Sequence, residues 1–404
     1  MRYIGNKTRL LGFIQKASEA MGLGGGRMHD AFSGTASVGR AFKERGWRVA
    51  SSDIMTYSYV FQRAYVVAQR SPAFTALRSG VGEVRATLRT ARFRDALAKR
   101  CSRTAGARGA SEPGGALMAV AEYLSSWIDP EPGFMTRHYS PRGGRMYFTE
   151  ENAGRIDAIR RRLHEWRRDG LIGDDEFFIL LAALIEAADR VANTAGVYAA
   201  YIKSWQPNAL RPLALTPLAP VRGPRGAQAY QADAASVAAS LGPVDLIYVD
   251  PPYNSRQYAG YYHVPEIIAR GWFDGAPAIA GKTGLLSRRE QRSAWCSARK
   301  VEGALTDLLE ATRARYILLS YNTEGLLGED AMLSILARFS ADDHVHRFTH
   351  RYRRYRADAD NSRRYREGEL REVLYCAKLR RGVEGGGRGG RKQRAANAIG
   401  GGEP

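Results

Sequence analysis

The chain has 404 residues, of which 44% are hydrophobic, and 61 Lys and Arg residues against 41 Asp and Glu residues give it a formal net charge of +20. Such an excess of positive charge is typical of proteins that bind nucleic acid, because each phosphate that the protein neutralises releases condensed counterions. A basic surface that is merely solvated would give the same net charge. The three cysteines are widely spaced, which argues against a disulfide framework and against a zinc site built on cysteine. No apolar run reaches the roughly 18 residues of a membrane-spanning helix. We therefore expect a soluble, cytoplasmic protein without membrane contact.

The first part of the chain, 1–69, alternates between helix and strand patterns and predicts the beginning of an α/β sheet. The segment 30–35, DAFSGT, follows a short strand and precedes a helix expected over about 35–45. Gly34 allows a sharp turn close to a ligand, and the free amides at the start of the helix favour a nucleotide. A second strand ends at Asp53, an acid about 20 residues beyond the glycine turn, where nucleotide-binding α/β folds contact ribose hydroxyls. By itself this pattern also fits an ordinary turn.

The middle of the chain, 70–228, has a different pattern and predicts a mainly helical insertion. Gly, Arg, Ser and Ala dominate 79–116. Over 150–168 the apolar residues share one helical face and arginines crowd the remainder, with Thr149 as the expected N-cap. The segment 176–193 is apolar on most sides, which predicts a buried helix.

Strand patterns return near the C-terminus, at 245–250, 314–321 and 370–379. A basic run at 351–372 predicts a hairpin loop that meets phosphates or, alternatively, a solvated charged face. The tail, 381–404, is rich in Gly and Arg with almost nothing apolar, so it is expected to be disordered.

The most specific motif is DPPY, which directly follows an apolar strand. Two prolines alone would only end the strand, but an acid before them and an aromatic ring after them, at the carboxyl end of a sheet strand, predict a ligand site. The lone pair of adenine's exocyclic amine is delocalised, and the Asp250 carboxylate together with a backbone carbonyl could accept hydrogen bonds from the NH₂ group and localise that lone pair. Pro251 and Pro252 would fix the direction of the carbonyl, and Tyr253 could stack on a base flipped out of the double helix.

DPPY at 250–253, together with DAFSGT at 30–35, resembles the signature of the D12 class of DNA adenine N6-methyltransferases. The N-terminal segment 2–7, RYIGNK, resembles the cofactor motif that precedes the glycine loop in that family. The order of these motifs resembles the alpha group, the Dam-like enzymes. The glycine loop is poorer in glycine than the family's commoner form, and Ala36 stands where dinucleotide-binding fingerprints have another glycine. Further details resemble modification methyltransferases of the FokI type: 145–149, 196–205 and 281–285.

The resemblance implies a Rossmann-like α/β sheet of about seven strands, the last one antiparallel, formed by 1–69 and 229–380, with 70–228 as an inserted helical target-recognition domain. It implies S-adenosylmethionine as methyl donor and double-stranded DNA as substrate, with a cognate restriction endonuclease as partner if the enzyme serves a restriction-modification system. An orphan role fits equally well, and the oligomeric state is left open, with a monomer as one possibility. The catalytic residues implied are Asp250, Pro251, Pro252 and Tyr253, without a metal. The cofactor-binding residues implied are Tyr3, Lys7, Asp30, Phe32, Gly34, Asp53 (for the ribose) and Asp233 (for the cofactor adenine).

Two neighbouring segments are further candidates for the site. The tyrosine-rich segment 254–266, with Arg256 and His263, allows two interpretations: a loop that clamps a flipped nucleotide, or a helix that buries its tyrosines. The segment 320–322 ends a strand on the same side of the sheet and is expected to line the pocket.

Other functions fit part of this pattern. An RNA methyltransferase acting on a base amine, such as guanine N2 of ribosomal RNA, can carry a DPPY-like tetrapeptide, but the segment 2–7 and the long insertion favour DNA. Cytosine N4 methylation usually resembles SPPY instead. A catalytically inactive DNA-binding protein with a decayed methyltransferase fold would be expected to lose Asp250 or Tyr253, and both are present.

Overall fold

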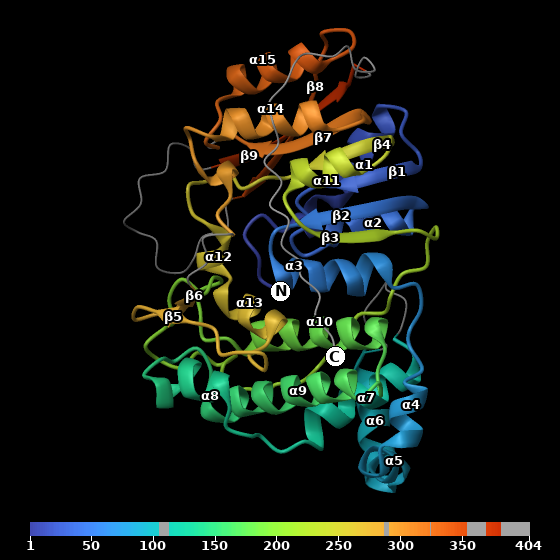
Figure 1. Ribbon diagram of the computed structural model, residues 1–404, viewed down its shortest axis with the longest axis vertical. Helices are drawn as coiled ribbons and strands as arrows, with labels where there is room; N and C mark the ends of the chain where they lie inside the picture. Colours follow the sequence, from blue (N-terminus) through green and yellow to red (C-terminus); the bar gives the residue numbers. More distant parts are fainter. Residues whose placement is uncertain (105–112, 287–290, 324, 354–368, 381–404) are drawn as a thin grey trace, which may run out of the picture.

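The structure, a computed structural model, describes residues 1–104, 113–286, 291–323, 325–353 and 369–380. A twisted sheet with helices on both faces forms the upper part of the molecule in Figure 1, and a group of helices forms the lower part. In these ranges no helix combines the length and the apolar character needed to cross a membrane. The tail 381–404 and the centre of the basic run, 354–368, lie outside the described residues, so the expectations for them stay predictions.

The large sheet has seven strands in the order β3-β2-β1-β4-β7-β9-β8. Its strands are β1 (Gly26–Asp30), β2 (Trp47–Asp53), β3 (Gln228–Gln231), β4 (Val244–Val249), β7 (Ala314–Asn322), β8 (His346–Arg353) and β9 (Glu369–Lys378). From β3 to β7 all neighbours are parallel, whereas β9 is antiparallel to both β7 and β8. The predicted α/β class, with about seven strands and the last one antiparallel, is confirmed. The strand order reverses between β1 and β4, which is where open α/β sheets bind ligands, at the carboxyl ends of the strands.

Both faces of the sheet are buried, which explains why its central strands read as nearly continuous apolar runs. Along β4, Leu246 and Tyr248 belong to one core cluster, and Ile247 and Val249 belong to the other. The helices α1 (Leu11–Ala20) and α2 (Ser37–Glu44) cover the first face. The second face is covered by α11 (Ala234–Ser240), α14 (Val301–Ala311) and α15 (Glu329–Phe339) (Figure 1).

The glycine turn between β1 and α2 is longer than the sequence predicts. Gly34 has a φ of 51° and Ala36 a φ of 59°, both in the left-handed region. That region favours glycine, because a Cβ atom approaches the carbonyl oxygen there. The fully buried Ala36 nevertheless adopts it, so α2 begins at Ser37, two residues after the predicted start, and ends at Glu44.

The lower part of the molecule is helical, as predicted for the middle of the chain. Its helices are α4 (Thr75–Gly80), α5 (Gly82–Arg89), α6 (Ala91–Thr104), α7 (Gly115–Ser126), α8 (Phe134–Tyr139), α9 (Glu150–Arg168) and α10 (Asp174–Val191). The helices predicted at 150–168 and 176–193 are confirmed as α9 and α10. Thr149 caps α9, since its hydroxyl accepts a hydrogen bond from the amide of Asn152 at 3.2 Å. The composition of 79–116 did not indicate α5 and α6.

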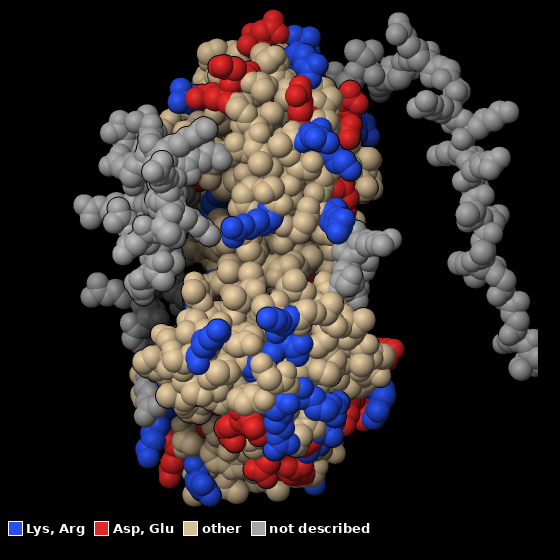
Figure 2. Space-filling model, turned by 90° about the vertical axis from the view of Figure 1, so that its left-hand side faces the viewer, with Lys and Arg blue, Asp and Glu red and all other residues tan. Residues whose placement is uncertain are grey.

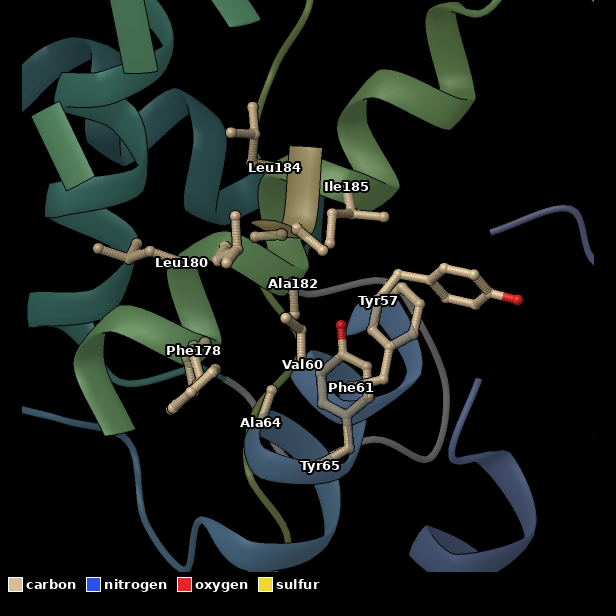
Figure 3. Close-up of a cluster of buried hydrophobic side chains, with 14 of the residues drawn as sticks. Tyr57, Val60, Phe61, Ala64, Tyr65, Phe178, Leu180, Ala182, Leu184 and Ile185 are labelled. Carbon is tan, nitrogen blue, oxygen red and sulfur yellow. The ribbon is translucent and has the colours of Figure 1, made fainter. Parts of the chain in front are cut away.

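The helical part and the sheet share one hydrophobic core. Helix α3 (Thr56–Phe61), continued by a π-helical turn (Gln62–Val67), follows β2 and packs against α10. Figure 3 shows Phe61 of α3 and Ala182 of α10 within this contact. Each large apolar side chain buried there contributes on the order of 1.5–3 kcal/mol. The helices predicted as an insertion are therefore anchored directly to the helix that follows β2.

Candidate active site

A pocket of about 250 Å³ lies at the carboxyl ends of β1, β2 and β4. Every catalytic and cofactor-binding residue predicted from the sequence lines it. These residues are Tyr3, Lys7, Asp30, Phe32, Gly34, Asp53, Asp233, Asp250, Pro251, Pro252 and Tyr253. The structure thus brings together motifs that are separated by up to about 250 positions in the chain. The roles of the individual residues stay predictions.

One side of the pocket is built from the glycine turn and the end of β2. The Asp53 carboxylate accepts hydrogen bonds from the amides of Gly34 at 3.0 Å and Met55 at 2.9 Å. Burial raises the pKa of Asp53 to about 6, although these amides act against the rise. The ring of Tyr3 lies against the turn, since a Cβ added to Gly34 would stand 3.0 Å from its Cε1 atom. Tyr3 in turn stacks on Tyr262, with 4.6 Å between ring centroids.

Two buried acceptors in the pocket wall have no hydrogen-bond partner among the described residues. The Oδ2 atom of Asp30 accepts from the Ser33 hydroxyl at 2.8 Å and from the Gly39 amide at 3.2 Å, but Oδ1 has no partner. Burial raises the pKa of Asp30 to about 7. The Gln291 amide nitrogen donates to Glu266 at 2.7 Å, which leaves its Oε1 atom without a partner. Both acceptors fit a ligand that carries amino or hydroxyl groups and positive charge, as S-adenosylmethionine does.

Asp233 occupies the exposed rim of the pocket. Its carboxylate caps α11 by accepting hydrogen bonds from the amides of Ala235 at 3.0 Å and Ser236 at 3.4 Å. Asp233 is exposed and belongs to the pocket lining, so the predicted adenine contact stays a prediction.

The opposite side of the pocket holds the DPPY segment and a buried ion cluster. Lys7, which is 3% exposed, lies 3.0 Å from Asp250 and 2.6 Å from Glu372. The Tyr253 hydroxyl accepts a hydrogen bond from Lys7, donates one to Asp250 and lies 2.9 Å from Oε1 of Glu372. Lys7, which the sequence analysis assigned to the cofactor, is therefore bound to the carboxylates of Asp250 and Glu372.

The charges in this cluster set the protonation of Asp250 and Lys7. Burial raises the pKa of Asp250 to about 6, with the positive charge of Lys7 acting against the rise and the negative charge of Glu372 adding to it. Burial would lower the pKa of Lys7, but the carboxylates of Asp250 and Glu372 raise it overall. Asp250 is consequently ionised at neutral pH and Lys7 is an ammonium.

Glu372 is a residue of this ion cluster that the sequence analysis missed, as it missed Gln291 in the pocket wall. It belongs to β9, where it is paired with Asn322 of β7 and His350 of β8, and it is 1% exposed. The sequence placed it at the end of the basic run, although one signal was present: an isolated acid at the start of an otherwise apolar strand segment. Ser320 donates to Glu372 at 2.5 Å, and none of the residues 320–322 belongs to the pocket lining, so the expectation that this segment lines the pocket is wrong.

The tyrosine-rich segment after DPPY forms two short helices, α12 (Tyr258–Tyr261) and α13 (His263–Arg270). Tyr261 and Tyr262 are buried, which agrees with the helix interpretation. Tyr258 instead lines the pocket, with its ring centroid 5.5 Å from that of Tyr3. The segment therefore combines packing residues with two residues of the pocket wall, Gln257 and Tyr258.

The three segments that resemble FokI-type enzymes meet beside the pocket. The Tyr147 hydroxyl donates to the carbonyls of Tyr198 at 2.7 Å and Thr283 at 3.1 Å. Thr283 lies in the turn between β5 (Ile279–Ala280) and β6 (Leu285–Leu286). Figure 2 shows this side of the molecule, with Lys and Arg side chains spread over the helical part and the sheet part. Exposed examples within two of these segments are Lys203 and Lys282.

The chain matches the family described as D12 class N6 adenine-specific DNA methyltransferase over residues 3–101 and 112–335. It is 34% identical over 382 residues to the type II methyltransferase M.NlaIII of Neisseria lactamica, an alignment covering 93% of this chain and 98% of that protein. It is also 34% identical over 378 residues to the type II methyltransferase M.FokI of Planomicrobium okeanokoites, with 93% of this chain and 52% of that protein covered. The modification methylase LlaI of Lactococcus lactis subsp. lactis is 32% identical over 384 residues, with 93% and 54% covered. The chain thus spans about half the length of M.FokI and LlaI.

Proposed function

Because the chain belongs to the D12 class of N6 adenine-specific DNA methyltransferases, we propose that it transfers the methyl group of S-adenosylmethionine to N6 of an adenine flipped out of double-stranded DNA. The observation that carries this proposal is the position of the Asp250 carboxylate. It lies partly buried directly after β4, in the same pocket as the glycine turn and Asp53. A hydrogen-bond acceptor for the amine and a nucleotide-type turn therefore face one another across a single cavity.

The cofactor would be held by the side of the pocket next to the glycine turn. Asp53 would accept from the ribose hydroxyls, and the unpartnered oxygens of Asp30 and Gln291 offer acceptors for amino or hydroxyl groups. Tyr3, Phe32 and Gly34 would form the wall against which the cofactor packs. When bound, S-adenosylmethionine supplies an electrophilic methyl group on a positively charged sulfur.

The DPPY segment would activate the amine. Asp250 accepts a hydrogen bond from the N6 amino group and keeps the nitrogen lone pair directed away from the ring. Pro251 and Pro252 hold the backbone of the segment in a fixed direction. Tyr253 releases Asp250 and stacks on the flipped base, which offsets part of the few kcal/mol lost on unstacking. Catalysis then consists mainly of positioning.

The helical part, 70–228, would serve as the target-recognition domain. The exposed Lys203 of this part, and the hydrogen bond from its Tyr147 to Thr283 of the sheet-containing part, support this assignment. The names of the relatives M.NlaIII, M.FokI and LlaI support a modification role in a restriction-modification system, with a cognate endonuclease as partner. Bases would be read by side chains of this part that reach the groove edges.

The proposal is tested by incubating the protein with labelled S-adenosylmethionine and either unmethylated genomic DNA or total RNA. Nucleoside analysis then identifies the product. Label in N6-methyladenine of DNA supports the proposal, and the Asp250→Ala variant should show none. Label confined to guanine of RNA would instead support the RNA methyltransferase, and no label in either substrate would refute methyl transfer to nucleic acid.

A further inference from the structure

Glu372 has more contacts with the DPPY side of the pocket than a packing role requires. It is a buried acid on β9, which is a strand that carries none of the residues assigned above. Its Oε1 atom lies 2.6 Å from the Lys7 ammonium, 2.9 Å from the Tyr253 hydroxyl and 2.5 Å from the Ser320 hydroxyl. One carboxylate thus contacts two side chains that also bind Asp250.

One oxygen of the Asp250 carboxylate already has two partners before an amine reaches it. Oδ1 of Asp250 already accepts from the Tyr253 hydroxyl and lies 3.0 Å from the Lys7 ammonium. An amine that donates to Oδ1 must displace at least one of them, whereas donation to the second oxygen, Oδ2, leaves both in place. A buried ammonium that loses its counter-charge is costly, so Lys7 needs a second anion in reach. Glu372 is such an anion, and it is already closer to Lys7 than Asp250 is.

We propose that Glu372 is a positioning residue, which retains the Lys7 ammonium and orients Tyr253 so that Asp250 is released to accept the amine of the target base. This inference rests on the proposed function, because it assigns Glu372 a place in the same reaction. Glu372 itself touches neither the base nor the cofactor. It acts through Lys7 and Tyr253.

The charges around the cluster agree with this role. Burial would raise the pKa of Glu372, but Lys7 and the hydrogen bonds from Ser320 and Tyr253 lower it overall, so the carboxylate is ionised. Asp250 is faced by Lys7 from the N-terminal segment, by Glu372 from β9 and by Tyr253 of its own loop. Tyr248 of β4, Asp30 of β1 and Tyr258 of α12 are further titratable groups near it in the described part of the chain.

The decisive variant is Glu372→Gln, which preserves the shape of the side chain and an acceptor for Ser320 but removes the charge. We expect the single-turnover rate of methyl transfer to unmethylated genomic DNA to fall by about tenfold or more, because misplacement by 1 Å costs on the order of 10²-fold. The acid limb of the pH–rate profile should move to lower pH, because the negative charge of Glu372 contributes to the raised pKa of Asp250. Equilibrium binding of S-adenosylmethionine should change little.

Asp157→Asn is the matched control. Asp157 is also a buried carboxylate, 2% exposed, but it binds the amides of Gly133, Met135 and Thr136 at the start of α8, outside the pocket. Its replacement should lower thermal stability and leave the acid limb in place. A structural role for Glu372 would produce that same result in Glu372→Gln.

A second measurement does not depend on activity. Competitive labelling with acetic anhydride, followed by mass spectrometry, reports the pKa of Lys7 in the protein without cofactor or DNA. Loss of Glu372 should lower that pKa and increase labelling of Lys7, since one of its two counter-charges is gone.

The outcomes separate the inference from the proposed function. If the wild type methylates adenine while Glu372→Gln leaves both the acid limb and the labelling of Lys7 unchanged, the inference is overturned and the proposed function stands. A shifted acid limb with altered Lys7 labelling supports the inference. A wild-type protein that methylates no adenine refutes the proposed function, and the inference with it.

Discussion

The carboxylate of Asp53 accepts a hydrogen bond from the backbone amide of Gly34, with 3.0 Å between the two atoms, so the end of β2 is tied to the turn after β1. The same turn has the Tyr3 ring packed against it. The cofactor side of the pocket therefore depends on a backbone conformation that few residues other than glycine adopt. This relationship leads to the first prediction.

Replacing Gly34 by Ala is expected to weaken S-adenosylmethionine binding, measured by calorimetry. The left-handed backbone disfavours a Cβ by about 1–2 kcal/mol, and the new atom would also stand 3.0 Å from the Tyr3 ring. Gly46→Ala is the control, because Gly46 has a φ of 87° but no atom within 4 Å of its Cβ position. Both variants should lose thermal stability. Equal cofactor affinity in the two would show that the turn does not contact the cofactor.

Asp250→Ala is expected to abolish methyl transfer while cofactor and DNA binding persist. Without the Asp250 carboxylate, no acceptor localises the lone pair of the amine. A side chain positioned in this way accelerates a reaction by about 10²–10⁴-fold. Asp245→Asn is the control from the other end of β4, where Asp245 binds the amide of Arg27 at 2.9 Å. Single-turnover assays with labelled cofactor measure the rates. Full activity in Asp250→Ala would remove Asp250 from the mechanism.

The rate of methyl transfer is expected to rise with pH and to level off above about 6, which is the pKa of Asp250. Only the ionised carboxylate accepts from the amine, so protonation below that pH stops the reaction. The measurement is a single-turnover pH profile at saturating cofactor and DNA, from pH 5 to pH 8. A rate independent of pH over that range would mean that the ionisation of Asp250 does not control the reaction.

Asp30 is expected to make the ligand-free protein less stable as the pH rises. Burial raises its pKa from 3.8 to about 7, so the folded state binds this proton more tightly than the unfolded state does. Its stabilising contribution is fully present below about pH 4 and is lost as the pH rises through about 7. Asp30→Asn should therefore raise the melting temperature at pH 8 relative to the wild type, with little gain at pH 4. A gain of the same size at both pH values would contradict this assignment.

Lys203 and Lys282 are expected to contact DNA phosphates. Replacing either by Gln should weaken DNA binding and reduce the slope of log K against log salt by about 0.9, the change expected for one lost phosphate contact. Arg48→Gln is the control, because Arg48 is exposed at the amino end of β2, whereas the pocket lies at the carboxyl end of that strand. Fluorescence anisotropy at several salt concentrations measures the affinities. An unchanged slope in both lysine variants would place the DNA elsewhere.

The sequence by itself determined the fold class, the glycine turn, the DPPY segment and the helices α9 and α10. These features are local: an apolar strand that runs into Asp250, a glycine where φ is positive, and an apolar stripe capped by Thr149 are visible within about 20 consecutive residues. Family resemblance added the residues Tyr3 and Lys7, whose own neighbourhood shows no chemical signal.

Only the tertiary structure decided where Lys7 points and that Glu372 belongs to the site. These two residues are 365 positions apart and meet because β9 pairs antiparallel with β7, which places Glu372 opposite the carboxyl end of a parallel strand. The tertiary structure also showed that Ala36 adopts a left-handed backbone conformation and that α3 packs against α10. Local sequence patterns specify which face of a strand or helix is buried, whereas strand order and helix packing determine which buried side chains meet.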